Sequence, residues 1–356
     1  MDTEILIVGG GLSGLAAAWQ LRAAGLDATL LEGRDRFGGR ILTADPEGAA
    51  CDLGPSWFWP GQPRIAALLE HFQIPHFEQF AEGDVLFEQM DGMVIRRAQP
   101  SPMAGALRIA GGIQRLTDAI VEQIDPSHRL PEHRVTGLTL DGDGVLVEAQ
   151  APSGEVRFRA KTVAVAVPPR LAAGLDYTPA LPKRALEVLA TTPTWMGGHA
   201  KFFAVYETPF WRRRGLCGSA ISWRGPLAEI HDVSPQRTPT QLGSLFGFVR
   251  MDAAGHAKLG RDTIIRHATD QLGHLFGDQA REPKAVHLQD WSFEPLTAAH
   301  ADRVPLTRHP DYGLDPPLGP WQGKLAFIST ETSFEHGGLI EGALAAGLRF
   351  AQSVIS

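Results

Sequence analysis

The first 31 residues contain a short apolar segment, a glycine-rich turn and a helix in immediate succession. Residues 4–8 (Glu-Ile-Leu-Ile-Val) are almost wholly apolar, as expected for a central parallel strand that is covered on both faces. A helix is predicted from about Leu12 to Ala24, because Gly25 ends it, and residues 28–31 form the next strand. This strand–helix–strand unit predicts an α/β fold that begins with a parallel sheet.

The turn in this unit has the spacing of a dinucleotide-binding fingerprint, Gly9-Gly10-Gly11-Leu12-Ser13-Gly14. Gly9 permits the tight turn, Gly11 lets the backbone approach a pyrophosphate, and Gly14 allows the helix to pack closely on the strand. The helix N-terminus adds unpaired N–H groups and partial positive charge. Glu32, at the end of the second strand, can accept hydrogen bonds from an adenosine ribose. We therefore expect a Rossmann-type domain whose cofactor site includes Gly9, Gly11, Ser13, Gly14 and Glu32.

The residues that follow Glu32 distinguish FAD from NAD, since both cofactors use this fingerprint. A second glycine pair and an arginine follow the acid, as in the extended flavin motif, in the segment Glu32-Gly33-Arg34-Asp35-Arg36-Phe37-Gly38-Gly39-Arg40. We expect Gly38 and Gly39 to leave room for backbone near the phosphates, and Arg40 to be a charge-assisted partner for them. A surface ion pair is the alternative for Arg40. With Arg34 in the same segment, the motif predicts FAD as the cofactor.

Length, charge and cysteine content limit the remaining classes of protein. With 356 residues, of which 44% are hydrophobic, the chain is too long for one simple domain, so we expect two. A formal net charge of −7 and only short basic runs argue against nucleic acid as a partner. Two cysteines, Cys51 and Cys217, suit a reducing compartment, and we expect a cytoplasmic location. The histidines and cysteines form no metal-binding pattern, so no metal site is expected.

The two ends of the sequence show no targeting segment. The first strand begins almost at once, without the charged and apolar regions of a secretory signal. The last apolar helix, residues 339–355, is interrupted by Glu341 and Arg349 and is shorter than the roughly 20 apolar residues that a membrane span requires. We expect a packed helix and no membrane partner.

Further blocks of the sequence resemble the flavin-containing amine oxidase family, which includes monoamine and polyamine oxidases. Residues 52–57 (Asp-Leu-Gly-Pro-Ser-Trp) are similar to the family segment beside the flavin ring, which implies cofactor contacts from Gly54, Pro55 and Ser56. Pro55 stands where the family usually has a second glycine. Residues 134–138 resemble the strand that meets the adenine, which implies a contact from Val135. The resemblance extends along nearly the whole chain and implies FAD-dependent oxidation of an amine.

Lys201 is the residue for which the resemblance implies a catalytic role. Residues 200–211 resemble the monoamine oxidase strand that carries a lysine hydrogen-bonded, through water, to flavin N5. A positive charge in that position can stabilise negative charge that develops when oxygen reacts. The alternative is a lysine at a strand end that extends its amine to solvent.

The closing block of the chain, residues 327–332 and 338–343, is similar to the family strand and helix that return to the flavin domain. The similarity implies that Glu331 contacts the ribityl or phosphate side of the cofactor. It also implies that backbone N–H groups near Leu339 and Ile340 point toward the flavin C2 carbonyl. A helix N-terminus there would stabilise negative charge on the reduced ring.

Two departures from the family concern the cofactor linkage and the substrate. The region around residues 310–313 lacks the cysteine that attaches FAD covalently in monoamine oxidases, so we expect non-covalent FAD. Leu339 occupies the position of one tyrosine of their two-tyrosine amine cage, and Tyr312 approximates the other. Core packing is the alternative for the aromatic residues, and helix capping for His336. With Phe248 as a further aromatic candidate, the substrate pocket is expected to include Trp57, Phe203, Tyr206, Trp291, Tyr312 and His336.

The sequence thus predicts an α/β chain with a Rossmann-type FAD-binding domain and a second, α+β substrate domain. Residues 1–60, 130–170 and 285–356 are assigned to the FAD-binding domain, and residues 61–129 and 171–284 to the substrate domain. A small-molecule amine is expected to bind between them and to be oxidised to an imine, with molecular oxygen as acceptor and hydrogen peroxide as product. Two alternatives stay open: a flavin-dependent dehydrogenase or desaturase of a non-amine hydrophobic substrate, and a non-catalytic FAD-binding redox sensor. The particular amine and the oligomeric state are left open.

Overall fold

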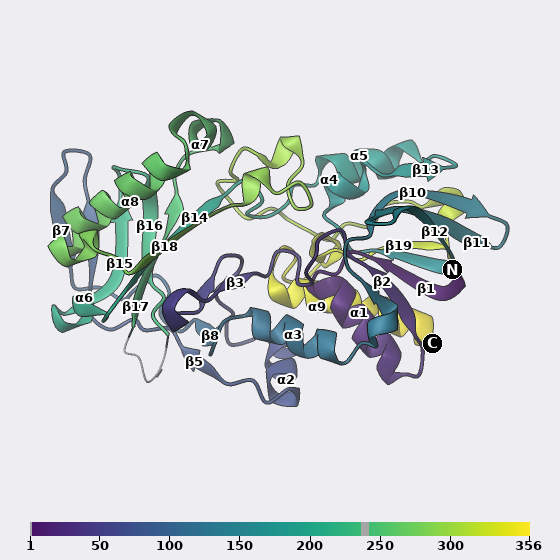
Figure 1. Ribbon diagram of the computed structural model, residues 1–356, viewed down its shortest axis with the longest axis horizontal. Helices are drawn as coiled ribbons and strands as arrows, with labels where there is room; N and C mark the ends of the chain where they lie inside the picture. The colour runs from purple at the N-terminus through teal and green to yellow at the C-terminus, as the bar shows by residue number, and fades with distance from the viewer. Residues whose placement is uncertain (1, 236–241) are drawn as a thin grey trace.

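The computed structural model describes residues 2–235 and 242–356, in which two large sheets lie toward opposite ends of the molecule (Figure 1). The first sheet has the order β13-β10-β11-β12-β1-β2-β9, and β19 also pairs with β12. Its strands are β1 (Asp2–Val8), β2 (Ala28–Leu31), β9 (Arg129–Leu130), β10 (Arg134–Asp141), β11 (Gly144–Ala151), β12 (Gly154–Val165), β13 (Asp176–Thr178) and β19 (Leu325–Phe327).

Helices cover both faces of this first sheet. One face carries α1 (Leu12–Ala23), α2 (Pro63–His71), α3 (Gln114–Glu122) and α9 (Ile340–Ile355), whose apolar side chains share one core with β1 and β2. The other face carries α4 (Pro169–Ala172) and α5 (Lys183–Thr191), which share a second core with β10, β11 and β12. Because β1 pairs in parallel with both β2 and β12, it is the central, fully covered strand that its apolar sequence predicts.

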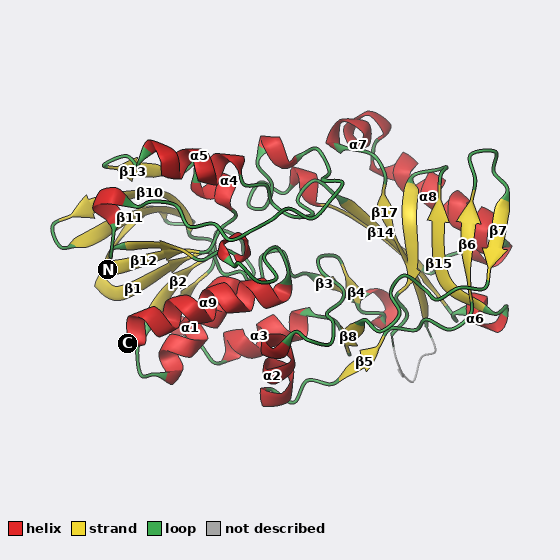
Figure 2. Ribbon diagram, turned by 180° about the vertical axis from the view of Figure 1, so that it is seen from behind, coloured by secondary structure: helices red, strands yellow, loops and turns green. Residues whose placement is uncertain are grey.

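The second sheet has the order β18-β14-β17-β16-β15-β6-β7, and α8 lies against it (Figure 2). Its strands are β6 (Asp84–Glu88), β7 (Val94–Arg97), β14 (Ala200–Tyr206), β15 (Leu216–Ser222), β16 (Leu227–Asp232), β17 (Gly243–Val249) and β18 (Ala285–Asp290). The helices near this sheet are α6 (Phe210–Arg213), α7 (Ala253–Leu259) and α8 (Arg261–Phe276). Pairing within the sheet is antiparallel except between β6 and β15.

Smaller elements complete the part of the chain that the structure describes. Two short antiparallel pairs join β3 (Thr43–Ala44) to β4 (Cys51–Asp52), and β5 (His76–Glu78) to β8 (Leu107–Ile109). The 3-10 helices are η1 (Pro46–Gly48), η2 (Pro126–His128), η3 (Asp278–Arg281), η4 (Trp291–Phe293), η5 (His300–Asp302), η6 (Gly319–Trp321) and η7 (Thr330–Thr332).

The expected Rossmann-type α/β fold is confirmed at the N-terminus. The predicted strand, helix and strand at 4–8, 12–24 and 28–31 are observed at 2–8, 12–23 and 28–31. The predicted closing helix at 339–355 is observed at 340–355, packed against α1. None of the helices among the described residues combines the length and the apolar character that a membrane crossing needs.

The cores of the first and the second sheet are built from chain segments that differ from the expected domain segments. Side chains of α2 and α3, which fall in the expected substrate segment 61–129, pack in the core of the first sheet. Strand β18, which falls in the expected FAD-binding segment 285–356, is instead the edge strand of the second sheet. The expected boundaries follow sequence blocks, whereas the amphipathic helices α2 and α3 bury their apolar sides against α1 and α9. We propose a division of the chain that follows these cores.

Candidate active site

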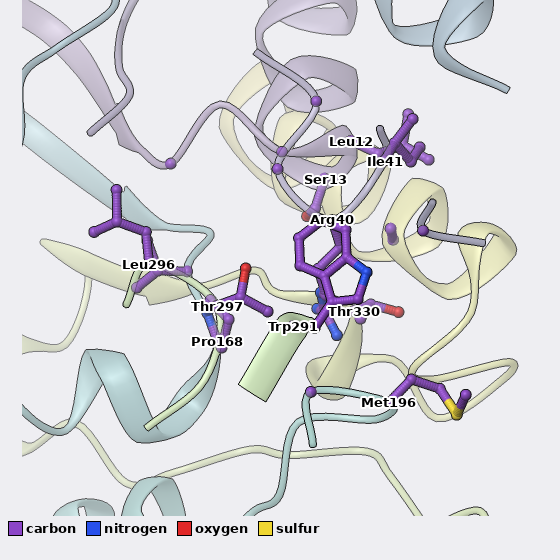
Figure 3. Close-up of a pocket in the computed structure, with 18 of the residues that line it drawn as sticks. Leu12, Ser13, Arg40, Ile41, Pro168, Met196, Trp291, Leu296, Thr297 and Thr330 are labelled. Carbon is purple, nitrogen blue, oxygen red and sulfur yellow. The ribbon is translucent and has the colours of Figure 1, made fainter. Parts of the chain in front are cut away.

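A cavity of about 570 Å³ extends from the glycine turn after β1 to side chains on β14 and β17 of the second sheet. Its lining therefore comes from both sheets and from the loops between them. Figure 3 shows Ser13, Arg40, Trp291 and Thr330 gathered in this cavity, with Met196 apart from them. Such a position, at the carboxyl ends of parallel strands, is where α/β sheets bind ligands.

The glycine turn leaves the cavity open where a pyrophosphate would lie. Gly9 has φ +108°, which favours glycine, and a Cβ at Gly14 would overlap the backbone oxygen of Gly9. Gly11 is different: a Cβ there would have only the Cα of Gly39 within 4 Å, at 3.9 Å. Gly14 is therefore needed for α1 to pack, while Gly11 keeps a path open for a ligand. Gly38 and Gly39, both with positive φ, line the same part of the cavity.

Glu32 lines the cavity at the end of β2, held by two backbone donors. Its carboxylate oxygens accept hydrogen bonds from Gly10 N and Arg34 N, each at 2.8 Å. The Arg34 guanidinium lies 3.7 Å from one of these oxygens. Each carboxylate oxygen keeps a second lone pair, so Glu32 can also accept a ribose hydroxyl. Val135, at the start of β10, lines the cavity too.

Arg40 and Glu331 form an ion pair, which changes the role expected for the glutamate. The Arg40 guanidinium donates to both Glu331 carboxylate oxygens, at 2.8 and 3.3 Å. Glu331 is fully buried and does not line the cavity, whereas Arg40 does. The Glu331 side chain therefore does not reach the cavity, where the sequence predicts that it contacts the cofactor. The carboxylate is directed at the guanidinium, and Glu331 holds Arg40 in place at the cavity wall.

Lys201 on β14 points into the cavity and is 6% exposed. Its ammonium donates to the backbone oxygen of Gly54 and to Ser56 Oγ at 3.1 Å, and lies 3.4 Å from the backbone oxygen of Asp52. The ring of Phe246 lies 4.5 Å from the same nitrogen. A solvent-directed lysine, the alternative considered from the sequence, is not observed. Lys201 instead fixes the segment that was expected to pass beside the flavin.

Burial lowers the pKa of Lys201 to about 7. The negative charge of Asp52 opposes this shift, and the positive charge of Arg108 adds to it. Asp52 is itself buried: Thr43 Oγ1 and Ile113 N donate to its Oδ1 at 2.7 and 2.9 Å, while its Oδ2 has no partner among the described residues. A lysine with a pKa near neutrality, at the wall of a cavity, is typical of a functional site.

The remaining predicted cofactor positions gather near Lys201. Gly54, Pro55 and Ser56 line the cavity, and a Cβ at Gly54 would overlap the backbone oxygen of Arg40. Leu339 and Ile340 also line the cavity, at the start of α9. The Leu339 N–H, expected to face the flavin, donates instead to His336 O at 3.0 Å. Only the helix N–H groups that follow it are left without an intrahelical acceptor.

Of the side chains predicted for the substrate pocket, Trp57, Trp291 and Phe248 line the cavity. Phe203 packs in a core with Phe246, at a ring distance of 5.2 Å, and Tyr206 donates to Ala280 O at 3.0 Å on the opposite face of β14. Tyr206 belongs to the core on the opposite face, because strand residues alternate between faces. Phe203 shares the face of Lys201, but it lies two residues farther along the strand and packs against Phe246 in the core there.

Two further predicted pocket residues lie outside the cavity lining. Tyr312 donates its hydroxyl to Pro193 O at 2.8 Å, and its ring packs beside Gly338, so a residue that lines the cavity separates it from the pocket. His336 is exposed, in a turn where its φ is +55°, and its carbonyl accepts the Leu339 N–H.

Other lining residues were not predicted from the sequence. His199 precedes Lys201 by two residues and so shares its face of the strand, a signal that could have identified it. Trp195 and Met196 lie on the irregular segment before β14, where no periodic pattern marks a pocket residue. Trp59, Gln62 and Met103 likewise lie outside the helices and strands.

Comparison with known proteins agrees with this geometry. Residues 88–355 match the family model described as flavin containing amine oxidoreductase, and residues 7–72 match that of an NAD(P)-binding Rossmann-like domain. The chain is 27% identical to AofH of Mycobacterium tuberculosis, whose name assigns it to the flavin-containing monoamine oxidases, covering 99% of this chain and 96% of that protein. It is 24% identical to putrescine oxidase of Kocuria rosea, covering 100% and 95%.

Solved structures show the same fold. A solved structure of putrescine oxidase bound to putrescine superposes with a TM-score of 0.82 at 23% identity, covering 100% of this chain and 99% of that one. Cyclohexylamine oxidase from Brevibacterium oxydans gives a TM-score of 0.81 at 20% identity. The family model covers most of the chain, and the resemblance inferred from the sequence is confirmed. This protein is an FAD-dependent oxidoreductase that belongs to the flavin-containing amine oxidoreductase family.

Proposed function

We propose that the enzyme oxidises an amine to an imine at the end of the cavity where Lys201 lies, with oxygen as the electron acceptor and hydrogen peroxide as product. The observation that supports this most is the buried ammonium of Lys201, which faces the cavity from the second sheet. When bound, FAD supplies the hydride acceptor for the C–N bond and returns the electrons to oxygen. Relatives named as monoamine oxidases and as a putrescine oxidase support an amine substrate.

The residues around the cavity would bind the cofactor through its whole length. The turn at Gly11 and the N-terminus of α1 would hold the pyrophosphate, and Glu32 the adenosine ribose. Arg40, fixed by Glu331, would place a positive charge at the phosphate side. Gly54 and Ser56, fixed by Lys201, would shape the wall for the flavin ring.

The protein's part in the reaction would be orientation, water exclusion and electrostatics. Lys201 would hold a proton and a positive charge at Nζ, where negative charge develops as oxygen is reduced. The aromatic rings of Trp57 and Phe248, 5.9 and 5.5 Å from Nζ, would exclude bulk water and strengthen the field of that charge.

The test of this proposal is anaerobic bleaching of the flavin absorbance across amines, polyamines and amino acids, followed by measurement of peroxide in air. Bleaching by an amine and peroxide formation are expected. Reduction by lipid or aromatic substrates alone would identify a dehydrogenase or desaturase, and bound FAD without any bleaching would identify a redox sensor. A cytoplasmic location stays a prediction that rests on Cys51 and Cys217, both free and buried.

We predict that purified protein is yellow and releases intact FAD on acid or heat denaturation. The reason is that neither cysteine lines the cavity, so no thiol is placed to attach the flavin. The measurement is the absorbance spectrum of the supernatant and of the washed precipitate after acid treatment. Flavin absorbance that stays with the denatured chain would contradict non-covalent binding.

Replacing Glu32 with alanine should weaken FAD binding by about 1.5–3 kcal/mol, the range for hydrogen bonds to a charged group. The Kd would then rise roughly 10- to 150-fold. Titration of apoprotein with FAD, followed by flavin fluorescence, measures this change.

Glu32→Gln is the matched control, because it keeps the shape and one acceptor for the backbone donors. Thermal unfolding of the apo variants separates the ribose contact from support of the turn by Gly10 N and Arg34 N. An unchanged FAD affinity in Glu32→Ala would remove Glu32 from the cofactor site.

A further inference from the structure

The charged side chains that line the cavity are strongly unequal in sign. Among the described residues the lining contains one carboxylate, Glu32, and five cations, Arg34, Arg40, Arg134, Arg170 and Lys201. Glu32 lies at the nucleotide end of the cavity, beside the glycine turn. The excess of cations suits the negatively charged phosphates of FAD. It also means that no lining carboxylate is available at the opposite end, where the amine would bind. Residues 236–241, Gln-Arg-Thr-Pro-Thr-Gln, contain no acidic residue.

Carboxylates just behind the cavity wall are already paired with these cations. Asp302 is buried, and its carboxylate accepts hydrogen bonds from the Arg170 guanidinium and from Thr194 N, the latter at 3.0 Å. Glu331 forms an ion pair with Arg40. Neither acid lines the cavity, so neither can face a ligand unless an existing ion pair breaks. Breaking a buried pair is strongly unfavourable because it leaves an uncompensated charge.

The end of the cavity beside Lys201 is lined by aromatic and apolar side chains. Trp57 and Phe248 lie within 6 Å of the ammonium, and His199 lies 6.3 Å from Phe248 and 6.5 Å from Trp195 between ring centres. Burial lowers the pKa of His199, and the positive charge of Lys201 lowers it further. This shift favours the neutral imidazole, and its buried Nδ1 has no hydrogen-bond partner among the described residues.

The cations near this end offer no free partner for an anion either. Arg170 is paired with Asp302 and donates to Ala190 O at 3.2 Å. Lys201 is occupied by the backbone oxygens of segment 52–56 and by Ser56. A second charge of either sign on the substrate would therefore be desolvated here without a partner, which is costly.

Taking the proposed amine oxidation as its basis, we propose that the substrate is a monoamine whose remaining body is uncharged and apolar, and that diamines, polyamines and amino acids are excluded. The names of the relatives do not decide this, since they include monoamine oxidases and a putrescine oxidase. The discrimination arises from the lining: aromatic rings accept an apolar body, and no lining carboxylate at this end offers a partner to a second ammonium.

Matched substrates test the proposal on the holoenzyme. Pentylamine and butane-1,4-diamine are linear molecules with the same number of non-hydrogen atoms. They differ at one end, where pentylamine has a methyl group and the diamine has its second ammonium. 2-Phenylethylamine and phenylalanine differ only by the carboxylate. In each pair we expect kcat/KM to be at least roughly 100-fold higher for the substrate without the second charge.

A substitution at Met103 tests whether charge is the cause. Met103 is half-buried and lines the cavity, on the segment that leads to the bridge between Phe58 and Leu107. Met103→Glu would add a carboxylate, and Met103→Gln is the matched control of the same shape. Met103→Glu should raise the diamine-to-monoamine ratio of kcat/KM roughly tenfold or more relative to Met103→Gln.

The outcomes separate this inference from the function on which it rests. Equal or higher kcat/KM for butane-1,4-diamine or phenylalanine in the native enzyme would overturn the inference and leave amine oxidation intact. Equal ratios in the Met103 variants would overturn the argument from charge. Absence of flavin bleaching by every amine would overturn both the inference and the proposed function.

Discussion

Replacing Lys201 with methionine is expected to slow the reaction of the reduced enzyme with oxygen on the order of 10²-fold, the effect typical of removing one preorganised electrostatic group. Reduction by the amine should change only a few-fold. The reason is differential: a positive charge helps most in the step in which negative charge develops, namely electron transfer to oxygen. Methionine has a similar length and no charge, so the fold and FAD binding should be retained at a cost of about 1–3 kcal/mol for the acceptors in segment 52–56 that lose their donor. Stopped-flow absorbance at the flavin bands measures the two half-reactions separately.

The pH dependence of the oxygen reaction gives an independent measure of the same group. Burial lowers the pKa of Lys201 to about 7, so the ammonium form predominates below that pH and the neutral amine above it. The rate constant for oxygen should therefore fall as the pH rises through about 7. In Lys201→Met this dependence should be absent.

Lys284→Met is a suitable control, because it removes one lysine beside the same strand: Lys284 N donates to Val205 O of β14 at 2.7 Å. Lys284 lies next to β18, pairs with Glu207 at 2.6 Å and does not line the cavity. Its replacement should leave both half-reactions unchanged. If Lys201→Met also keeps the native oxygen rate and pH profile, Lys201 is a structural residue that holds segment 52–56, and the assignment as an oxidase rests on the family alone.

Local sequence patterns predicted the parts of the fold whose causes are local. The apolar run before Gly9 and the helix that stops near Gly25 each arise from neighbouring residues, and each element is observed. The domain segments were less accurate, because α2 and α3 pack on α1 and α9, which are distant in sequence. Which core an amphipathic helix joins is decided by tertiary contacts that a single sequence does not display.

The same distinction applies to the candidate site. The positions taken from sequence motifs, such as Glu32 and Lys201, line the cavity. Glu331 does not line the cavity, because its carboxylate pairs with Arg40. That pair could not be predicted, since the two residues are 291 positions apart and no local pattern indicates it. Tyr206 could have been excluded by counting from Lys201, since five positions along a strand place it on the opposite face. Trp195 and Met196 could not be found in this way, as they lie in an irregular segment.

The glycine turn permits a prediction that separates cofactor binding from folding. Gly11→Val should weaken FAD binding by roughly 3–6 kcal/mol, more than 10²-fold in Kd, while the apoprotein stays folded. The estimate combines about 1–3 kcal/mol for overlap of the side chain with the bound pyrophosphate and the loss of charge-assisted hydrogen bonds from the helix N-terminus. The fold should tolerate valine because a Cβ at Gly11 has only Gly39 Cα within 4 Å, and its φ of −73° is ordinary.

Gly14→Val, three residues away, is expected to do the opposite, since its Cβ would overlap the backbone oxygen of Gly9 and force α1 away from β1. That variant should unfold at lower temperature even without FAD, because a packed helix–strand contact cannot absorb such an overlap without moving the backbone. Circular dichroism melting of both apoproteins and flavin titration of Gly11→Val measure the two effects. Native FAD affinity in Gly11→Val would mean that the pyrophosphate does not pass over the turn, and the cofactor would have to be placed elsewhere in the cavity.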